Sequence, residues 1–321
     1  MQHTPTFAVM LATPMYVFLS FSTNALGGMW ERIVGTPEPP PAPITLSFVG
    51  DMMFDRYIRE KANLNGYDAI LRDVHPTLQQ STLVFGNLEG PITTFTPVAD
   101  YRDSGPNHYR FTFATTVAQT LRSANFSAVT LSNNHTGNFG TEGLEQTTQW
   151  LDQAGVGYVG GPTDPYTPWR TATSGHDIAV YAYDPWNLPE DEILLTRIQA
   201  EATSTFVILL AHWGEEYETV PNKSQRDLAR AFIDAGVDFI AGSHPHVIQN
   251  KEKYQDAWIY YSLGNFVFDQ YFSAQVRCGA VVTLTLDTNH TYSVAESFIQ
   301  LAENGTTIQS DCKTEVASIQ Q

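Results

Sequence analysis

The residues of this chain that are best suited to chemistry stand where apolar, strand-like runs end. Seven polar residues follow five such runs: Asp51, Glu89, Asn134, His135, His212, His244 and His246. Carboxylates and neutral imidazoles are ligands for zinc, manganese or iron, and the absence of cysteine from the set argues against a cysteine-type structural zinc site. The set therefore indicates metal-dependent chemistry.

Each of these patterns is weak when it is taken alone. A Gly-Asp pair after a strand, as at Asp51, is more often a turn than a metal ligand. The Asn-Asn-His run that ends at His135 is also suited to cap a helix, because asparagine is favoured at that position. The pair His244 and His246 is stronger, since alternate side chains of an extended backbone point to one side. The order of the whole set along the chain carries the prediction.

The elements that must position these residues follow from hydrophobic periodicity. Strands are expected at 44–49, 82–85, 127–131, 178–183, 206–210, 237–241, 258–262 and 280–286. Helices are expected near 66–80, 115–124, 141–154, 191–202 and 223–235. This alternation predicts an α/β fold whose sheets are covered by helices. Because ligands gather at the carboxyl ends of strands in such folds, the polar residues are expected to form one site.

Composition limits the partners of the chain. Of its 321 residues, 17 are Lys or Arg and 34 are Asp or Glu, which gives a net charge of −17. Such a field repels phosphate backbones, so no nucleic-acid partner is expected, and it disfavours polyanions unless metal ions add local positive charge. Plain solubility also explains the acidity.

The ends of the chain are expected to lie outside the folded domain. Residues 1–35, with the apolar run 7–21, indicate a signal peptide or a loose membrane anchor, although a buried N-terminal helix is the alternative. Residues 36–43 form a proline-rich linker. The domain is expected to span 44–310, with an edge strand after about 287 and a loose tail at 311–321. An extracytoplasmic, exported or loosely anchored location follows.

The cysteines leave one question open. Cys278 and Cys312 form no Cys-x-x-Cys unit, so a zinc knot is not supported. They are either a disulfide of an exported domain or two separate buried thiols.

Six strings carry a family resemblance: Phe-Val-Gly-Asp-Met-Met (48–53), Asn-Leu-Glu-Gly (87–90), Ser-Asn-Asn-His (132–135), Ala-His-Trp-Gly-Glu-Glu-Tyr (211–217), Gly-Ser-His-Pro-His-Val (242–247) and Ser-Leu-Gly-Asn-Phe-Val-Phe-Asp-Gln (262–270). Together they resemble the calcineurin-like metallophosphoesterase superfamily and, in their closer wording, the CapA family of poly-γ-glutamate capsule biosynthesis proteins. The resemblance covers about 44–286. It implies a four-layer αββα sandwich, in which two mixed sheets are flanked by helices.

The resemblance also implies roles for the residues. One or two divalent transition ions (manganese, zinc or iron) would be bound by Asp51, Glu89, Asn134, His212, His244 and His246. His135 matches the general acid. Four further residues are expected beside the substrate or behind the ligands: Asn87, Arg56, Glu216 and Asn265. For Arg56, an ion pair with Asp55 or Asp68 is as good a reading as a contact with a substrate anion.

Two departures from the superfamily pattern stand out. Met53 occupies the place of a ligand histidine, and a thioether is a poor ligand for a hard divalent ion, so the ion position beside Asp51 is expected to be the weaker one. Asn138 stands where the family often has an aspartate, which is expected to weaken the interaction that fixes His135.

The function that follows is a metal-dependent hydrolase of a phosphoester or of a γ-glutamyl amide, linked to capsule polymer at the cell envelope. Polyglutamate or a phosphoester is the expected substrate, and a membrane-bound capsule synthesis machinery is the expected partner. The alternative is a non-catalytic accessory protein for the synthesis or export of the polymer.

Overall fold

Two β-sheets face each other in the computed structural model, which describes residues 42–312 except 103, 104, 106, 188–190, 203, 288 and 289. The expected leader (1–35), most of the linker (36–41) and the tail beyond Cys312 lie outside the described residues. No helix in the described part of the chain has the length and apolar character needed to cross a bilayer.

The first sheet has a parallel half and an antiparallel half, which meet at β1. Its order is β14 (Thr307–Ser310), β13 (Tyr292–Leu301), β12 (Cys278–Leu286), β1 (Ile44–Met52), β2 (Leu83–Leu88), β3 (Ala128–Thr130) and β4 (Gly157–Val159), with β11 (Asn265–Val267) beside the end of β1. Strands β1 to β4 run parallel, and β12 to β14 are antiparallel to their neighbours. β1 is buried along almost its whole length, as a strand covered on both faces must be.

The second sheet has a parallel core with an antiparallel strand at each edge. Its order is β5 (Trp169–Thr173), β6 (His176–Tyr183), β7 (Phe206–His212), β8 (Phe239–Ser243), β10 (Ala257–Tyr260) and β9 (Lys251–Tyr254). Apolar side chains of the two sheets meet in a shared core, in which Phe48 of β1 packs against Phe239 of β8 with ring centroids 4.7 Å apart.

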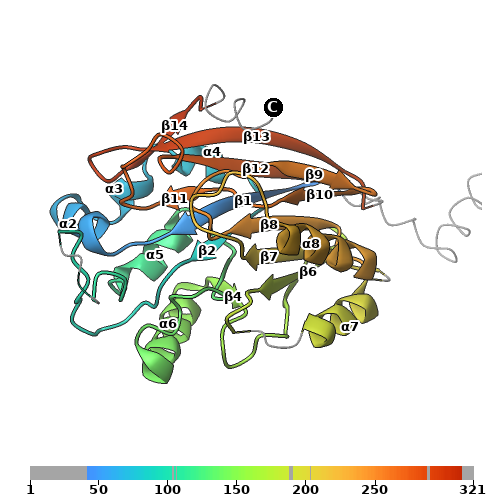
Figure 1. The fold of residues 1–321 in the computed structure, drawn as a ribbon, viewed down its shortest axis with the longest axis horizontal. Helices are drawn as coiled ribbons and strands as arrows, with labels where there is room; N and C mark the ends of the chain where they lie inside the picture. The colour runs from blue at the N-terminus through green and yellow to red at the C-terminus, as the bar shows by residue number, and fades with distance from the viewer. Residues whose placement is uncertain are drawn as a thin grey trace, which may run out of the picture. The chain divides into compact units, whose positions relative to one another are not determined.

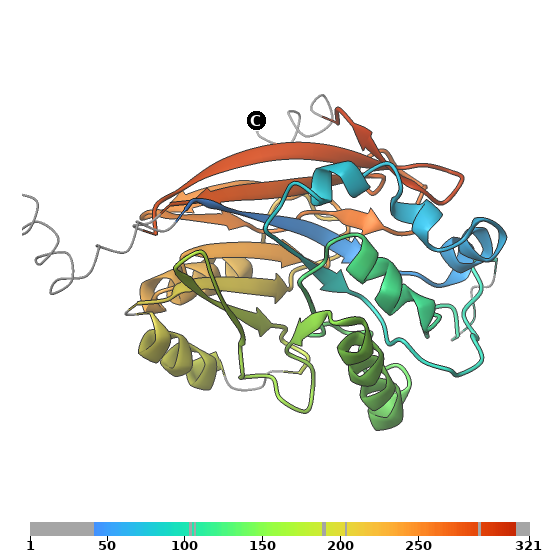
Figure 2. The same cartoon turned by 180° about the vertical axis from the view of Figure 1, so that it is seen from behind.

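Helices cover the outer face of each sheet (Figures 1 and 2). The first sheet is covered by α2 (Arg56–Asn65), α3 (Asp68–Leu71), α4 (His75–Leu78), α5 (Thr116–Ser123) and α6 (Gly140–Ala154). The second is covered by α7 (Asp191–Glu201) and α8 (Lys223–Ala235). The helix–sheet–sheet–helix order confirms the expected α/β sandwich of four layers.

Local sequence explains where these helices begin and end. In α8, Asn222 and Gln225 form a capping box, which satisfies backbone N–H groups that have no partner within the helix. The helix ends at Ala235, and the capping residue Gly236 has a φ of 112°, which is accessible to glycine. Its apolar stripe, which includes Phe232 and Ile233, packs on the second sheet.

Several sequence expectations need correction. The helix expected at 66–80 is two short helices, α3 and α4, and α2 before them was missed because its polar sequence buries only Arg56, Ile58 and Ala62. Short strands β4, β5, β9 and β11 were also missed. The chain after 287 adds two strands, β13 and β14, where one edge strand was expected.

The cysteines form a disulfide. Cys278, at the start of β12, is bonded to Cys312, with their Cα atoms 6.2 Å apart. Both residues are buried. The bond fixes the segment after β14 to β12.

Candidate metal centre

The predicted site residues come from the ends of strands in both sheets. Asp51, Glu89, Asn134 and His135 belong to or follow β1, β2 and β3 of the first sheet, and His212, His244 and His246 belong to or follow β7 and β8 of the second. The register of the strands brings Asp51 beside Asn87 and His212 beside Ser243. The site is therefore built where the two sheets meet.

One tight group combines Asp51, Glu89 and His246. Ligand-type atoms of these three buried residues all lie within 4.8 Å of one another. His246 Nδ1 is 3.1 Å from Asp51 Oδ2, and its Nε2 is 3.6 Å from Glu89 Oε1. Glu89 Oε1 is buried and has no hydrogen-bond partner among the described residues. A buried carboxylate oxygen without a partner is costly, so the group fits a bound cation.

A second group lies beside it and contains Asn134, His212 and His244. His212 Nε2 is 3.0 Å from Asn134 Oδ1, and the rings of His212 and His244 are 4.7 Å apart. His244 Nδ1 is buried and also lacks a partner among the residues described. Asp51 Oδ1 lies 4.0 Å from His212 Nδ1, which places the two groups next to each other.

The electrostatics of the site favour neutral imidazoles. Burial, reinforced by the charge of His244, holds the pKa of His212 well below its usual value. Burial and the charge of His246 likewise lower the pKa of His244. At neutral pH these rings therefore keep the lone pairs that a metal ion requires.

The pKa values of the two carboxyl groups are shifted in opposite directions. Burial and the nearby charge of Asp51 raise the pKa of Glu89 well above its usual value. Burial would also raise the pKa of Asp51, but the hydrogen bond and charge of His246 lower it further than burial raises it. A divalent cation would relieve the repulsion between the carboxylates, and oxygen and nitrogen donors of this kind suit zinc, manganese or iron.

Asn87 holds both carboxylates, and a neighbour that the sequence did not single out sets its orientation. Asn133 Nδ2 donates to the Leu88 carbonyl and to Asn87 Oδ1, both at 2.9 Å. The Asn87 amide nitrogen must therefore face Asp51 Oδ1 at 2.8 Å and Glu89 Oε2 at 3.2 Å. Asn87 is thus a donor to the ligands. The Asn-Asn-His run was the only sequence signal for Asn133.

Asn265 fixes the position of the proton on His246. Its Nδ2 donates to the Val276 carbonyl at 2.9 Å, so its Oδ1 faces His246 Nδ1, 3.0 Å away, as an acceptor. The proton of His246 is thereby fixed on Nδ1. In the neutral ring, the lone pair is then on Nε2, 3.6 Å from Glu89 Oε1, as a metal ligand requires.

His135 lies at the opening of the site. Its side chain is 13% exposed, and Nε2 is 3.9 Å from Glu89 Oε1. Burial and the charge of His246 lower the pKa of His135 to about 4. Asn138, the departure from the family pattern, does contact His135: its Nδ2 lies 3.2 Å from Nδ1 and donates to the Tyr109 carbonyl. This N–H donor favours a bare Nδ1 and a proton on Nε2.

Arg56 is buried and pairs with neither of the expected aspartates. Its guanidinium forms an ion pair with Asp269, and Nη1 lies 2.8 Å from His108 Nε2. Asp55 instead caps α2, and Asp68 accepts a hydrogen bond from the Thr120 hydroxyl. The guanidinium packs 5.0 Å from the centroid of the Phe111 ring, whose other contacts include His135 at 4.4 Å. Arg56 therefore lies behind the site.

Met53 does not join the ligands. Its side chain is fully buried, and its sulfur accepts the backbone N–H of Asp55 at 3.0 Å. The Asp51 side of the site, which the sequence marks as the weaker ion position, nevertheless gathers three ligand-type groups.

Two exposed aromatic residues flank the histidines and were not predicted. Trp186 is 50% exposed and its ring is 4.8 Å from that of His244. Tyr217 is 43% exposed and its ring is 6.2 Å from that of His246. Glu216 is exposed beside Tyr217, and its charge, after burial and Asp51, further raises the pKa of Glu89. The exposed residues beside the candidate metal centre are therefore aromatic and acidic.

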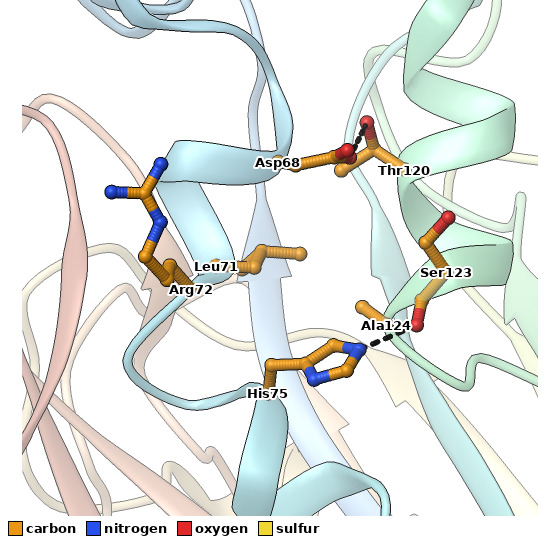
Figure 3. Close-up of a pocket in the computed structure, with 7 residues that line it drawn as sticks. All are labelled: Asp68, Leu71, Arg72, His75, Thr120, Ser123 and Ala124. Atoms are coloured by element: carbon orange, nitrogen blue, oxygen red, sulfur yellow. Dashed lines mark hydrogen bonds between the residues drawn. The ribbon is translucent and has the colours of Figure 1, made fainter.

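A separate cavity lies among the helices of the first sheet. It has a volume of about 230 Å³ and is lined by Asp68, Leu71, Arg72, His75, Thr120, Ser123 and Ala124. Figure 3 shows His75 hydrogen-bonded to the Ser123 carbonyl and Asp68 to Thr120 across this cavity. None of the predicted site residues lines it, so it is distinct from the metal centre.

The chain is similar in sequence to bacterial capsule synthesis proteins. The family model described as bacterial capsule synthesis protein PGA_cap matches residues 45–270. The PGA biosynthesis protein CapA of Bacillus subtilis (strain 168) is 35% identical over 306 residues, which cover 88% of this chain and 78% of that protein. The capsule biosynthesis protein CapA of Bacillus anthracis is 33% identical over 249 residues, or 71% of this chain and 60% of that protein.

Among solved structures, a phosphatase from Mycoplasma pneumoniae aligns with a TM-score of 0.48 and 14% identity, covering 81% of this chain and 94% of that one. A TM-score below 0.5 does not establish a shared fold, so the assignment rests on the sequence matches. The chain belongs to the PGA_cap family of bacterial capsule synthesis proteins.

Proposed function

We propose that the domain is a metal-dependent hydrolase that cleaves a phosphoester or a γ-glutamyl amide during the production of capsule polymer. The observation that carries this proposal is the buried group of Asp51, Glu89 and His246, in which Glu89 Oε1 has no partner among the described residues. The family and its named relatives support the link to capsule polymer.

The proposed ligands fall into two neighbouring positions. Asp51, Glu89 and His246 would hold one ion, and Glu89, Asn134, His212 and His244 the other. A divalent cation supplies Lewis-acid polarisation of the substrate and promotes the ionisation of water. Asn87 holds the two carboxylates in place through its amide hydrogens, and Asn265 fixes the proton of His246.

His135 would assist the departure of the leaving group. With a pKa of about 4 it is neutral at pH 7, and its neutral ring carries one proton. The Asn138 amide directs an N–H at Nδ1, which leaves that proton on Nε2, on the side of Glu89. The neutral ring of His135 can therefore donate a hydrogen bond from Nε2 to a leaving oxygen or nitrogen of the substrate.

We place the domain outside the cytoplasm, after a leader within residues 1–35 and a linker at 36–43, near membrane-bound synthesis machinery. The disulfide between Cys278 and Cys312 supports an oxidising compartment.

The test combines metal analysis with a substrate screen. Purified protein is expected to hold one or two transition ions per chain. It is expected to hydrolyse a member of a panel of phosphoesters and γ-glutamyl peptides, and His135→Ala is expected to lower kcat by about 10²–10⁴-fold while the ions stay bound. His246→Ala should lose an ion.

His75→Ala is the control, because His75 lines the separate cavity. Bound ions with no turnover of either substrate class would contradict the hydrolase and favour an accessory role in handling the polymer.

A further inference from the structure

Ser243 is a buried residue at the end of β8, and its hydroxyl has two hydrogen-bond partners in the candidate metal centre. Its Oγ lies 2.9 Å from His212 Nδ1 and 3.2 Å from the Ala211 carbonyl. A hydroxyl has one hydrogen and two lone pairs, so it can donate to either partner and accept from a third group. Which partner receives the hydrogen depends on where His212 carries its own proton.

Without a cation, the contacts of His212 favour a proton on Nε2. Nε2 is 3.0 Å from Asn134 Oδ1, so an Nε2–H would donate to that oxygen. Nδ1 would then be a lone pair and would accept the hydroxyl hydrogen of Ser243. Every polar atom of the imidazole is satisfied in this arrangement.

A cation between His212 and Asn134 requires the other tautomer. Nε2 must then offer a lone pair, so the ring proton has to be on Nδ1. Ser243 can accommodate it by turning its hydrogen to the Ala211 carbonyl and accepting from Nδ1–H. The ring loses one proton from Nε2 and gains one at Nδ1, so its net charge does not change.

Among the described residues, no other neighbour of His212 Nδ1 can accept this proton. Asn87 Nδ2 is 3.2 Å from His212 Nδ1, but a side-chain amide nitrogen is a donor and cannot accept this proton. Asp51 Oδ1 is 4.0 Å from Nδ1, beyond hydrogen-bond distance.

We propose that Ser243 is a positioning residue whose rotating hydroxyl lets His212 move its proton from Nε2 to Nδ1 when a cation binds. This inference rests on the metal ligation in the proposed function. It distinguishes the two ion positions: Asn265 fixes the tautomer of His246 permanently, since its amide is committed to the Val276 carbonyl, whereas Ser243 makes His212 adaptable.

The test is zinc binding by Ser243→Ala, followed by competition with a chelating dye. The variant still allows the metal-free tautomer but gives the Nδ1–H no acceptor. We expect its affinity for one zinc ion to fall about 10–100-fold. The melting temperature of the chelator-treated variant is also expected to fall, because the buried His212 Nδ1 and Ala211 carbonyl lose the Ser243 hydroxyl in the metal-free state. Ser243→Thr, which keeps the hydroxyl, should restore the affinity, and Ser47→Ala, which removes another buried hydroxyl far along β1, should have no effect.

A second measurement reads the tautomer directly. Nitrogen-15 NMR of labelled histidines should show the His212 proton on Nε2 in chelator-treated protein and on Nδ1 after zinc is added. An unchanged tautomer, or equal zinc affinity in Ser243→Ala and wild type, would overturn the role of Ser243 and leave the hydrolase proposal intact. Failure of the wild type to bind zinc would overturn both.

Discussion

At the scale of the residue, Asn138 shows how one atom controls the chemistry of a neighbour. Its amide nitrogen faces His135 Nδ1 where a carboxylate oxygen would stand if the residue were aspartate. An N–H in this place cannot accept a proton from the ring and does not stabilise the imidazolium. The low pKa of His135 is due first to burial and then to the charge of His246, and the neutral Asn138 does not offset them.

Asn138→Asp is therefore expected to raise the pKa of His135 from about 4. An opposite charge at this distance favours the charged ring by about 1–3 pKa units, and it also draws the proton to Nδ1. NMR titration of chelator-treated protein measures the change. Asn65→Asp on the exposed surface of α2 makes the same change in net charge and should leave His135 unaltered, whereas an unmoved pKa in Asn138→Asp would contradict the assigned contact.

The candidate metal ligands could be identified from the sequence, whereas the residues that orient them could not. The ligand types at the strand ends could be predicted because carboxylate and imidazole are suited to metals whatever surrounds them. Asn133 and Ser243 could not, because their roles depend on acceptors such as the Leu88 and Ala211 carbonyls, which only the folded chain brings to them. The partner of Arg56 was missed for the same reason, since Asp269 lies 213 positions away.

At the scale of the element, strands with long apolar runs were predictable and short edge strands were not. β6 and β7 lie in a buried parallel core, so their sequences are almost continuously apolar. β5 and β9 lie at edges, where half of the residues or more are only partly buried, and their polar sequences resemble loops. Glycine is needed at position 50, because a Cβ there would lie 1.8 Å from the Gly264 carbonyl oxygen. From the sequence alone, the Gly50-Asp51 pair is typical of a turn, and this close approach could not be predicted.

A carboxyl group immediately before β8, that of Asp238, makes stability depend on pH. Asp238 Oδ2 accepts the Val207 N–H at 2.7 Å, and burial raises its pKa from 3.8 to about 6 despite that hydrogen bond. The folded chain thus binds this proton more tightly than the unfolded chain does. As pH rises from about 4 through 6, the contribution of Asp238 to the free energy of unfolding falls.

Asp238→Asn should remove this dependence while its amide oxygen still accepts the Val207 N–H. A shift from 3.8 to about 6 corresponds to at most about 3 kcal/mol between acidic and neutral pH. Denaturant unfolding of chelator-treated wild type and variant at the two pH values measures the difference. The exposed Asp234→Asn is the control, and parallel pH dependence of wild type and Asp238→Asn would contradict the account.

At the scale of the whole molecule, the disulfide closes the antiparallel half of the first sheet. Cys278 and Cys312 are 34 positions apart and enclose β12, β13 and β14. Closing a loop of that length restricts the unfolded chain and stabilises the fold by up to about 4 kcal/mol.

Reduction with dithiothreitol should therefore lower the free energy of unfolding by about 2–4 kcal/mol. A double Cys278→Ala, Cys312→Ala variant should show the same loss and no further response to the reductant. Denaturant unfolding with and without dithiothreitol checks both statements, and equal stability of the oxidised and reduced wild type would show that the bond does not constrain the chain.

The placement of the ligands on two sheets has a consequence for how the protein matures. The His244 backbone reaches Asp51 across 193 positions, so no fragment that contains only one sheet has a complete ligand set. At the proposed site, a complete ligand set would form only after the chain has been synthesised through His246 and the two sheets have docked. Because a ligand that binds only the native state shifts the equilibrium toward it, capture acts as a late checkpoint that favours correctly folded chains.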